Sequence, residues 1–175
     1  MAKFILIRHA EPRYDEVDGR GYFGMGHELG RLTSNGELQA QRRGHDESLL
    51  GADIIISSPY TRALQTAATI SRITGIKLTV ENDLHEWMPD TTHQYKIDDF
   101  TKLYHEYRES KGIRNEHTKY PWESYDALKK RLFGVLDQYK HLKKVIVVCH
   151  GLIMSTTGDF EDLFDFVETK TIEYN

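Results

Sequence analysis

The chain has 175 residues, of which 39% are hydrophobic and 29% charged, and its formal net charge is −4. This length is typical of one domain that buries its own core, so we expect a single domain over residues 1–175. The excess of acidic residues argues against a nucleic-acid-binding protein, and no segment has the length and apolarity of a membrane span, so neither a nucleic acid nor a membrane is an expected partner.

The cysteine content and the N-terminus indicate a cellular location. Cys149 is the one cysteine of the chain, and it cannot form an internal disulfide or a zinc site by itself. The first apolar run, residues 4–7, is too short for a secretory signal and is followed at once by Arg8. We therefore expect a cytoplasmic protein, whereas the oligomeric state cannot be predicted.

Apolar runs and helical periodicity predict an alternation of strands and helices. The predicted strands are residues 4–7, 53–56, 76–80 and 145–148, with 166–174 as a final edge strand. The predicted helices are residues 34–50, 62–75 and 123–142, with a short helix after Gly151. Glu37 follows Ser34 in the spacing of a capping box, and Gly75 is a C-terminal cap. This order predicts an α/β fold, a three-layer α/β/α sandwich around a mostly parallel sheet.

Two segments have weaker patterns. Residues 87–122 are rich in charged and aromatic side chains, so we expect a loop-plus-helix excursion that covers a pocket rather than part of the core. The aromatic residues within it have partly helical spacing, which is typical of a packing face: Tyr95, Phe100, Tyr104 and Tyr107. Gly24-Met25-Gly26 lacks the spacing of a dinucleotide-binding loop and is expected to be a flexible loop.

Candidate site residues follow the predicted strands, where ligands bind in open α/β sheets. Arg8 and His9 follow the first strand, and Arg62 comes soon after the second. Glu86 and His150 follow later strands. Taken singly, each has an ordinary explanation as a solvated turn, a helix surface, an exposed acid or a core histidine. Together, two guanidinium groups, two imidazoles and a carboxylate predict a site for phosphate chemistry that needs no metal and no cofactor.

The segment Ile5-Leu6-Ile7-Arg8-His9-Ala10-Glu11 resembles the Arg-His-Gly signature of the histidine phosphatases and cofactor-dependent phosphoglycerate mutases, with alanine in place of glycine. Further segments resemble this family in the expected order, at residues 32–40, 57–67, 84–86 and 147–151. Pro12 and, approximately, Asp15 stand where the family often has threonine and asparagine. The resemblance implies a phosphoglycerate mutase-like fold, and it favours a phosphatase because a mutase is usually a longer chain.

The resemblance also suggests a mechanism. We expect a neutral His9 to attack phosphorus and form a phosphohistidine, while positively charged Arg8, Arg62 and His150 hold the phosphate oxygens. Glu86 would protonate the leaving oxygen and later accept a proton from water. The expected substrate is the phosphate monoester of a small metabolite or a phosphoprotein, with specificity residing in residues 13–31 and 87–122.

Two other functions remain open, namely mutase-type phosphoryl transfer and a phosphoryl-binding scaffold with little turnover. A cysteine-nucleophile phosphatase is excluded because Ser155, not arginine, stands six residues after Cys149. The motifs of nucleoside triphosphatases and serine hydrolases are absent, as is His-Glu-x-x-His. Most of the nine histidines are therefore interpreted as solvated, with His27, His85 and His93 as candidates for the pocket wall.

Overall fold

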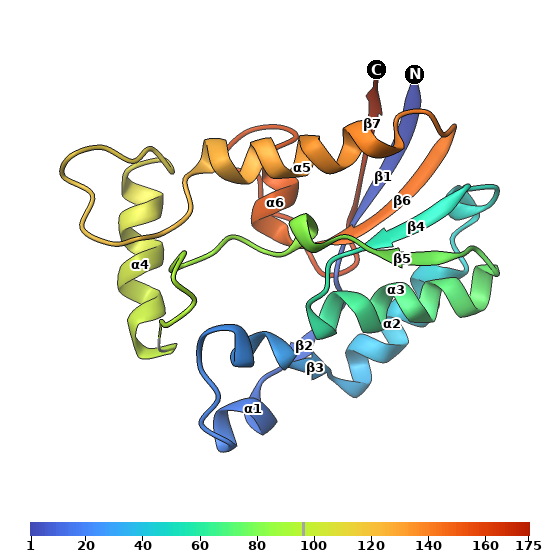
Figure 1. Ribbon diagram of the computed structural model, residues 1–175. Helices are drawn as coiled ribbons and strands as arrows, with labels where there is room; N and C mark the ends of the chain where they lie inside the picture. The colour runs from blue at the N-terminus through green and yellow to red at the C-terminus, as the bar shows by residue number, and fades with distance from the viewer. Residues whose placement is uncertain (96) are drawn as a thin grey trace.

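The computed structural model describes residues 1–95 and 97–175. Its centre is a five-stranded sheet in the order β5-β4-β6-β1-β7, with helices on both faces (Figure 1). The strands are β1 (Ala2–Arg8), β4 (Ile54–Ser57), β5 (Leu78–Val80), β6 (Lys144–Cys149) and β7 (Thr169–Tyr174). The first four run parallel, and β7 pairs antiparallel with β1 at the sheet edge. The predicted three-layer sandwich with a mostly parallel sheet is confirmed.

The alternation of side chains along the central strands divides the core into two layers. One face packs against α5 (Tyr125–Tyr139) and α6 (Gly151–Ser155), and the other packs against α3 (Thr61–Thr74) with α2 (Ser34–Gly44) beside it (Figure 1). The first layer includes Phe4, Leu6, Val145, Val147, Leu128, Leu132, Val135 and Leu136. The second includes Ile5, Ile7, Ile146, Val148, Ala63, Ala67 and Ile70. Strands buried on both faces explain why these runs are continuously apolar.

Helix α2 differs from its prediction at both ends. Its N-cap is Thr33 rather than Ser34, because the Thr33 hydroxyl accepts a hydrogen bond from the Gly36 amide. It ends at Gly44 rather than near residue 50, because Asp46 accepts a hydrogen bond from the Ser48 amide and opens a separate turn, η2 (Glu47–Leu49). A local cap therefore interrupts what looks in sequence like one continuous helix.

The other predicted elements are present with shifted ends. Helix α3 ends at Thr74 and is capped by Gly75, whose φ of 73° is the left-handed conformation expected of a glycine cap. Helix α5 is shorter than predicted at both ends, and Tyr139 is only partly buried. Strands β5 and β7 begin two and three residues later than expected, respectively, and α6 follows His150 as predicted.

Residues 87–122 contribute to the core, which corrects the expectation that they lie outside it. Trp87, Tyr107 and Trp122 are at most 3% exposed and belong to the same apolar cluster as α5. The ring centroid of Tyr107 lies 4.6 Å from that of Trp87 and 5.5 Å from that of Trp122. Helix α4 (Ile97–Glu109) carries Tyr107, and irregular chain carries both tryptophans. The two tryptophans are therefore buried without any regular period in the sequence, whereas Tyr107 belongs to the aromatic set with partly helical spacing.

The chain between β1 and α2 is built from short elements. They are β2 (Pro12–Arg13), α1 (Asp15–Gly19), η1 (Gly24–Leu29) and β3 (Arg31–Leu32), and η3 (Asn82–Leu84) follows β5 later in the chain. The segment expected to be a flexible loop thus forms the turn η1. At Gly24 a Cβ atom would lie 2.1 Å from the carbonyl oxygen of His93, so a glycine is required there. Within the described ranges, the helices are all too short or too polar to cross a bilayer.

Candidate active site

The carboxyl ends of the central strands bring the predicted residues together. Arg8 at the end of β1 is paired with Cys149 at the end of β6, so His9 and His150 leave the sheet side by side. Their ring centroids are 5.1 Å apart. Arg62, the second residue of α3, places its Nε 3.2 Å from Nε2 of His9. Arg8, His9, Arg62 and Glu86 line a cavity of about 530 Å³, and His150 lies fully buried against His9.

The hydrogen bonds of His9 define its tautomer. Nδ1 lies 2.7 Å from the carbonyl oxygen of Ala10. Because a carbonyl oxygen can only accept, Nδ1 carries the proton, and Nε2 keeps a lone pair beside Arg62. Burial, and then the Arg62 charge, lowers the pKa of His9 well below its ordinary value. The imidazole is therefore neutral near pH 7 and has the form that a nucleophile needs.

The loop that follows His9 is held by contacts with residues 57–67 and 32–40, two of the segments that resemble the family. The Ala10 amide donates to Thr66 Oγ1 at 3.0 Å, and the Glu11 amide donates to Gln39 Oε1 at 2.9 Å. At Gly36 a Cβ atom would lie 2.3 Å from the Glu11 carbonyl oxygen, so only glycine permits this approach. Ala10 is buried and is not among the non-glycine residues with a positive φ, so alanine replaces the family's glycine there without backbone strain.

Arg8 is held by the chain that leads into β7. Its Nη1 donates to the Phe164 carbonyl oxygen, and its guanidinium carbon lies 4.4 Å from the centre of the Phe166 ring. The Nε atom of Arg8 is buried and has no hydrogen-bond partner among the described residues. Phe166 was not expected in the site, because it was predicted as the first residue of the edge strand, and an aromatic residue there carries no functional signal in the sequence.

Arg62 contacts a carboxylate that the sequence did not reveal. Its Nη1 lies 2.5 Å from Oε2 of Glu28, and the hydroxyl of Tyr95 donates to the other carboxylate oxygen at 2.9 Å. The Arg62 and Glu28 side chains are 6% and 15% exposed, so the ion pair is largely shielded from water. A cation near a helix N-terminus suggested a bound anion. Glu28 supplies a negative charge there.

His150 differs from the expectation that it carries a positive charge. It is fully buried, its Nε2 lies 2.7 Å from the hydroxyl oxygen of Ser58, and its Nδ1 has no partner among the described residues. Burial and the nearby Arg62 lower the pKa of His150 well below its ordinary value. The imidazole of His150, which lies beside His9, is therefore neutral rather than an imidazolium.

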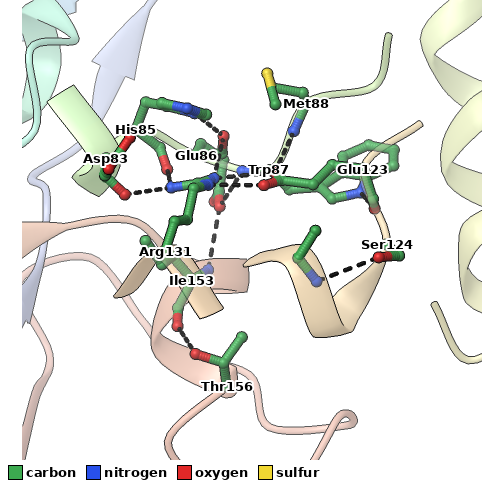
Figure 2. Close-up of polar contacts among 11 residues, drawn as sticks. Asp83, His85, Glu86, Trp87, Met88, Glu123, Ser124, Arg131, Ile153 and Thr156 are labelled. Carbon is green, nitrogen blue, oxygen red and sulfur yellow. Dashed lines mark hydrogen bonds and ion pairs between the residues drawn. The ribbon is translucent and has the colours of Figure 1, made fainter. Parts of the chain in front are cut away.

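The Glu86 carboxylate accepts three backbone hydrogen bonds. The Trp87 amide donates to it at 2.8 Å and the Ile153 amide of α6 at 3.2 Å (Figure 2). The Leu152 amide of α6 donates at 3.1 Å. Burial raises the pKa of Glu86, while the backbone donors oppose that rise. A carboxyl group with a raised pKa at a cavity wall is suited to donate and accept protons.

Comparison with known proteins identifies the family. The family model of the histidine phosphatase superfamily (branch 1) matches residues 4–158. The chain belongs to this superfamily. The histidine phosphatase is 30% identical over 157 residues to a protein of Hydrogenobacter thermophilus named "putative phosphoserine phosphatase 2", covering 86% of this chain and 74% of that protein. The predicted family, and the prediction of a phosphatase that acts on phosphate monoesters, are confirmed.

Solved structures confirm the fold of this histidine phosphatase. An alpha-ribazole phosphatase from Shigella flexneri matches with a TM-score of 0.71 and 20% identity, covering 99% of this chain and 91% of that one. A mycobacterial glucosyl-3-phosphoglycerate phosphatase matches with a TM-score of 0.73 and 14% identity, covering 97% of this chain and 89% of that one.

Two segments supply most of the rest of the cavity wall of the histidine phosphatase. Residues 13–31 and 87–122 were expected to carry specificity, and both contribute side chains. The wall beyond the phosphate-binding candidates includes Pro12, Tyr14, Asp18, His27, Glu28, Trp87, Pro89, Tyr95, Phe100, Leu152 and Phe166. His27 stacks on Tyr14 with ring centroids 4.5 Å apart, whereas His85 and His93 are not among the lining residues that the structure describes. The described residues contain no cluster of three or more His, Cys, Asp or Glu side chains arranged to hold a metal ion.

Proposed function

We propose that this histidine phosphatase hydrolyses the phosphate monoester of a small metabolite through a phosphohistidine formed on His9. The observation that carries the proposal is the tautomer of His9. Because Nδ1 donates to the Ala10 carbonyl oxygen, Nε2 carries a lone pair, which accepts a hydrogen bond from Nε of Arg62. A neutral imidazole whose lone pair lies next to a phosphate-binding cation is the arrangement that attack on phosphorus requires, once a phosphoryl group takes the place of this contact.

The two arginines and His150 are assigned to the phosphate oxygens. The buried Nε of Arg8 lacks a partner within the described structure, and Arg62 would exchange its contact with the His9 nitrogen for one with a phosphate oxygen. Placed donors of this kind are each worth about 3 kcal/mol in the transition state of comparable reactions. His150 contributes as a neutral donor through Nδ1, its nitrogen without a partner in the described structure.

Glu86 is assigned to proton transfer. As the bond between His9 Nε2 and phosphorus forms, the bond from phosphorus to the leaving oxygen breaks, and that oxygen takes a proton from Glu86. A water molecule then attacks the phosphohistidine and gives a proton to Glu86, and the bond between Nε2 and phosphorus breaks to release inorganic phosphate. Partial burial raises the pKa of the Glu86 carboxyl, which favours the protonated form that this role needs.

Two observations support a small metabolite as the substrate. The named relatives include phosphatases of alpha-ribazole and of glucosyl-3-phosphoglycerate, and one named after phosphoserine. The cavity of about 530 Å³ falls within the range of small-ligand sites. Tyr14, Trp87 and Tyr95 line the part of the cavity assigned to the leaving group. A panel of phosphorylated metabolites, assayed by phosphate release against a phosphopeptide, tests this assignment; preference for the phosphopeptide would contradict it.

The first test replaces the nucleophile. His9→Ala is expected to abolish release of phosphate from p-nitrophenyl phosphate and to abolish acid-labile labelling by a radioactive substrate. His117→Ala is the matched control, because His117 is exposed and its change should leave both measurements intact. Normal turnover by His9→Ala would overturn the mechanism, and so would activity that a chelator removes from the natural protein.

The second test addresses the acid. Glu86→Gln is expected to slow hydrolysis of phenyl phosphate more than hydrolysis of 2,4-dinitrophenyl phosphate, because a good leaving group needs no proton. The measurement is kcat/KM across a series of aryl phosphates. Equal slowing across the series would remove Glu86 from the acid role.

A further inference from the structure

We propose that Arg131 is a positioning residue, which together with Glu123 fixes residues 83–88 so that the Glu86 carboxyl faces the reacting oxygen. This inference rests on the proposed role of Glu86 as the acid. Arg131 comes from α5, and it is not among the residues that line the cavity. It would therefore act on the reaction through Glu86 rather than on the substrate.

The guanidinium of Arg131 contacts the backbone just before the acid and the carbonyl oxygen of the acid itself (Figure 2). Its Nη1 donates to the carbonyl oxygens of Asp83 at 2.5 Å and His85 at 2.6 Å, and its Nη2 donates to that of Glu86 at 3.0 Å. Nε and Nη2 also donate to the two carboxylate oxygens of Glu123, at 2.7 and 3.0 Å. A guanidinium has five N–H donors, and all five are engaged.

Glu123 ties the same segment from its other end. Its carboxylate accepts a hydrogen bond from the Met88 amide at 3.2 Å, and its backbone amide donates to the Met88 carbonyl oxygen at 2.9 Å. The Trp87 indole donates to the Glu123 carbonyl oxygen at 2.7 Å. Glu86 therefore lies between the contacts of Arg131, which precede it in the chain, and those of Glu123, which follow it; Arg131 and Glu123 form one ion pair.

The segment that carries Glu86 needs such support. After η3, residues 85–88 belong to no helix or strand, so no ladder of backbone hydrogen bonds holds them. The side chains of Glu123 and Arg131 are only 4% and 11% exposed, so water competes little for their contacts. A planar fork with five donors can reach three carbonyl groups and a carboxylate at once, which the three-donor ammonium of a lysine cannot do.

The test measures how the reaction depends on the leaving group. Arg131→Met is expected to lower kcat/KM for phenyl phosphate at least tenfold and to lower that for 2,4-dinitrophenyl phosphate several-fold less. The Ki of inorganic phosphate should stay within about twofold, because the phosphate-binding candidates are untouched. A merely structural role would instead slow the whole series equally and weaken phosphate binding, and that result would overturn the inference. Lys130→Met is the matched control, since Lys130 is the exposed neighbour on the same helix.

Two further variants keep the test decisive if Arg131→Met does not fold. Removal of Arg131 alone leaves the Glu123 carboxylate buried without a counter-ion, which is strongly destabilising. The double variant Arg131→Met with Glu123→Gln removes that stranded charge. Arg131→Lys keeps the positive charge but not the planar set of five donors. Like Arg131→Met, it should therefore lower kcat/KM for phenyl phosphate more than that for 2,4-dinitrophenyl phosphate. Wild-type dependence on the leaving group in Arg131→Lys would overturn the inference by itself.

The same series distinguishes this inference from the proposed function. If Glu86→Gln shows the leaving-group dependence and the Arg131 variants do not, the positioning role of Arg131 is wrong, whereas the acid role of Glu86 is supported. If Glu86→Gln shows no such dependence, the acid role itself falls.

Discussion

The Arg62 guanidinium makes hydrogen bonds to two side chains, those of His9 and Glu28. Its Nε contacts the His9 lone pair and its Nη1 contacts the Glu28 carboxylate, so an arriving phosphoryl group must compete with both. The first contact keeps the cation beside the nucleophile. The second places a negative charge next to the proposed phosphate site, where it opposes a dianion.

Glu28→Gln tests the effect of that negative charge. We expect the Ki of inorganic phosphate to fall about fivefold, on the order of 1 kcal/mol, because one like charge is removed near the dianion in a partly shielded site. Inhibition by phosphate of p-nitrophenyl phosphate hydrolysis gives the Ki. Glu37→Gln, the same change at an exposed position of α2, is the control. Weaker phosphate binding by Glu28→Gln would mean that the carboxylate orients Arg62 more than it repels the phosphate.

At the scale of elements, the start of α2 is a support for the His9 loop. Thr33 caps the helix. The side-chain oxygen of Gln39 accepts a hydrogen bond from the Glu11 amide, and Gly36 allows the Glu11 carbonyl oxygen to approach the helix backbone. A segment far from the chemistry in sequence therefore decides where the nucleophile lies.

Gly36→Ala should lower stability and activity together. The new methyl group would meet the Glu11 carbonyl oxygen at 2.3 Å, and backbone rather than a flexible side chain would have to move. Overpacking of this kind costs about 1–3 kcal/mol. Gly134→Ala in α5 is the matched control, since its methyl group would meet no atom within 4 Å and should be neutral or stabilising by up to about 1 kcal/mol. Urea denaturation measures both, and an equally stable Gly36→Ala would contradict the close contact.

At the scale of the whole molecule, the site joins parts that are distant along the chain. Arg8 comes from β1, Arg62 from α3, Glu86 from the segment after η3, and Phe166 from the chain before β7. Because these parts keep their geometry only in the folded protein, a ligand that bridges them binds the native state and not the unfolded chain.

Inorganic phosphate should therefore stabilise the protein. At a concentration 100 times its Kd, phosphate should raise the free energy of unfolding by about 2.7 kcal/mol. Thermal unfolding with increasing phosphate measures the effect. Arg62→Met should abolish most of the shift, and this variant also controls for the general stabilising action of phosphate ions on proteins. An equal shift in Arg62→Met would mean that phosphate acts elsewhere.

The central elements could be predicted because their patterns are local. Strands β1 and β6 are buried on both faces and are therefore continuous apolar runs, and α3 carries a periodic face and a glycine cap. The end of α2 could not be predicted, because one hydrogen bond from the Ser48 amide to the Asp46 carboxylate decided it. The burial of Trp87 and Trp122 could not be predicted either, since irregular chain leaves no period to detect.

For the site, the sequence alone determined which residues converge: Arg8, His9, Arg62 and His150 follow strands or begin helices at one edge of the sheet, and the parallel order of the strands brings such positions together. Only the tertiary structure decided that Glu28 pairs with Arg62, that Phe166 packs on Arg8, and that Arg131 holds the segment of Glu86. These contacts join loops and helix surfaces whose partners depend on three-dimensional packing. One carboxylate among 27 acidic residues carries no local sign of the cation that it will meet.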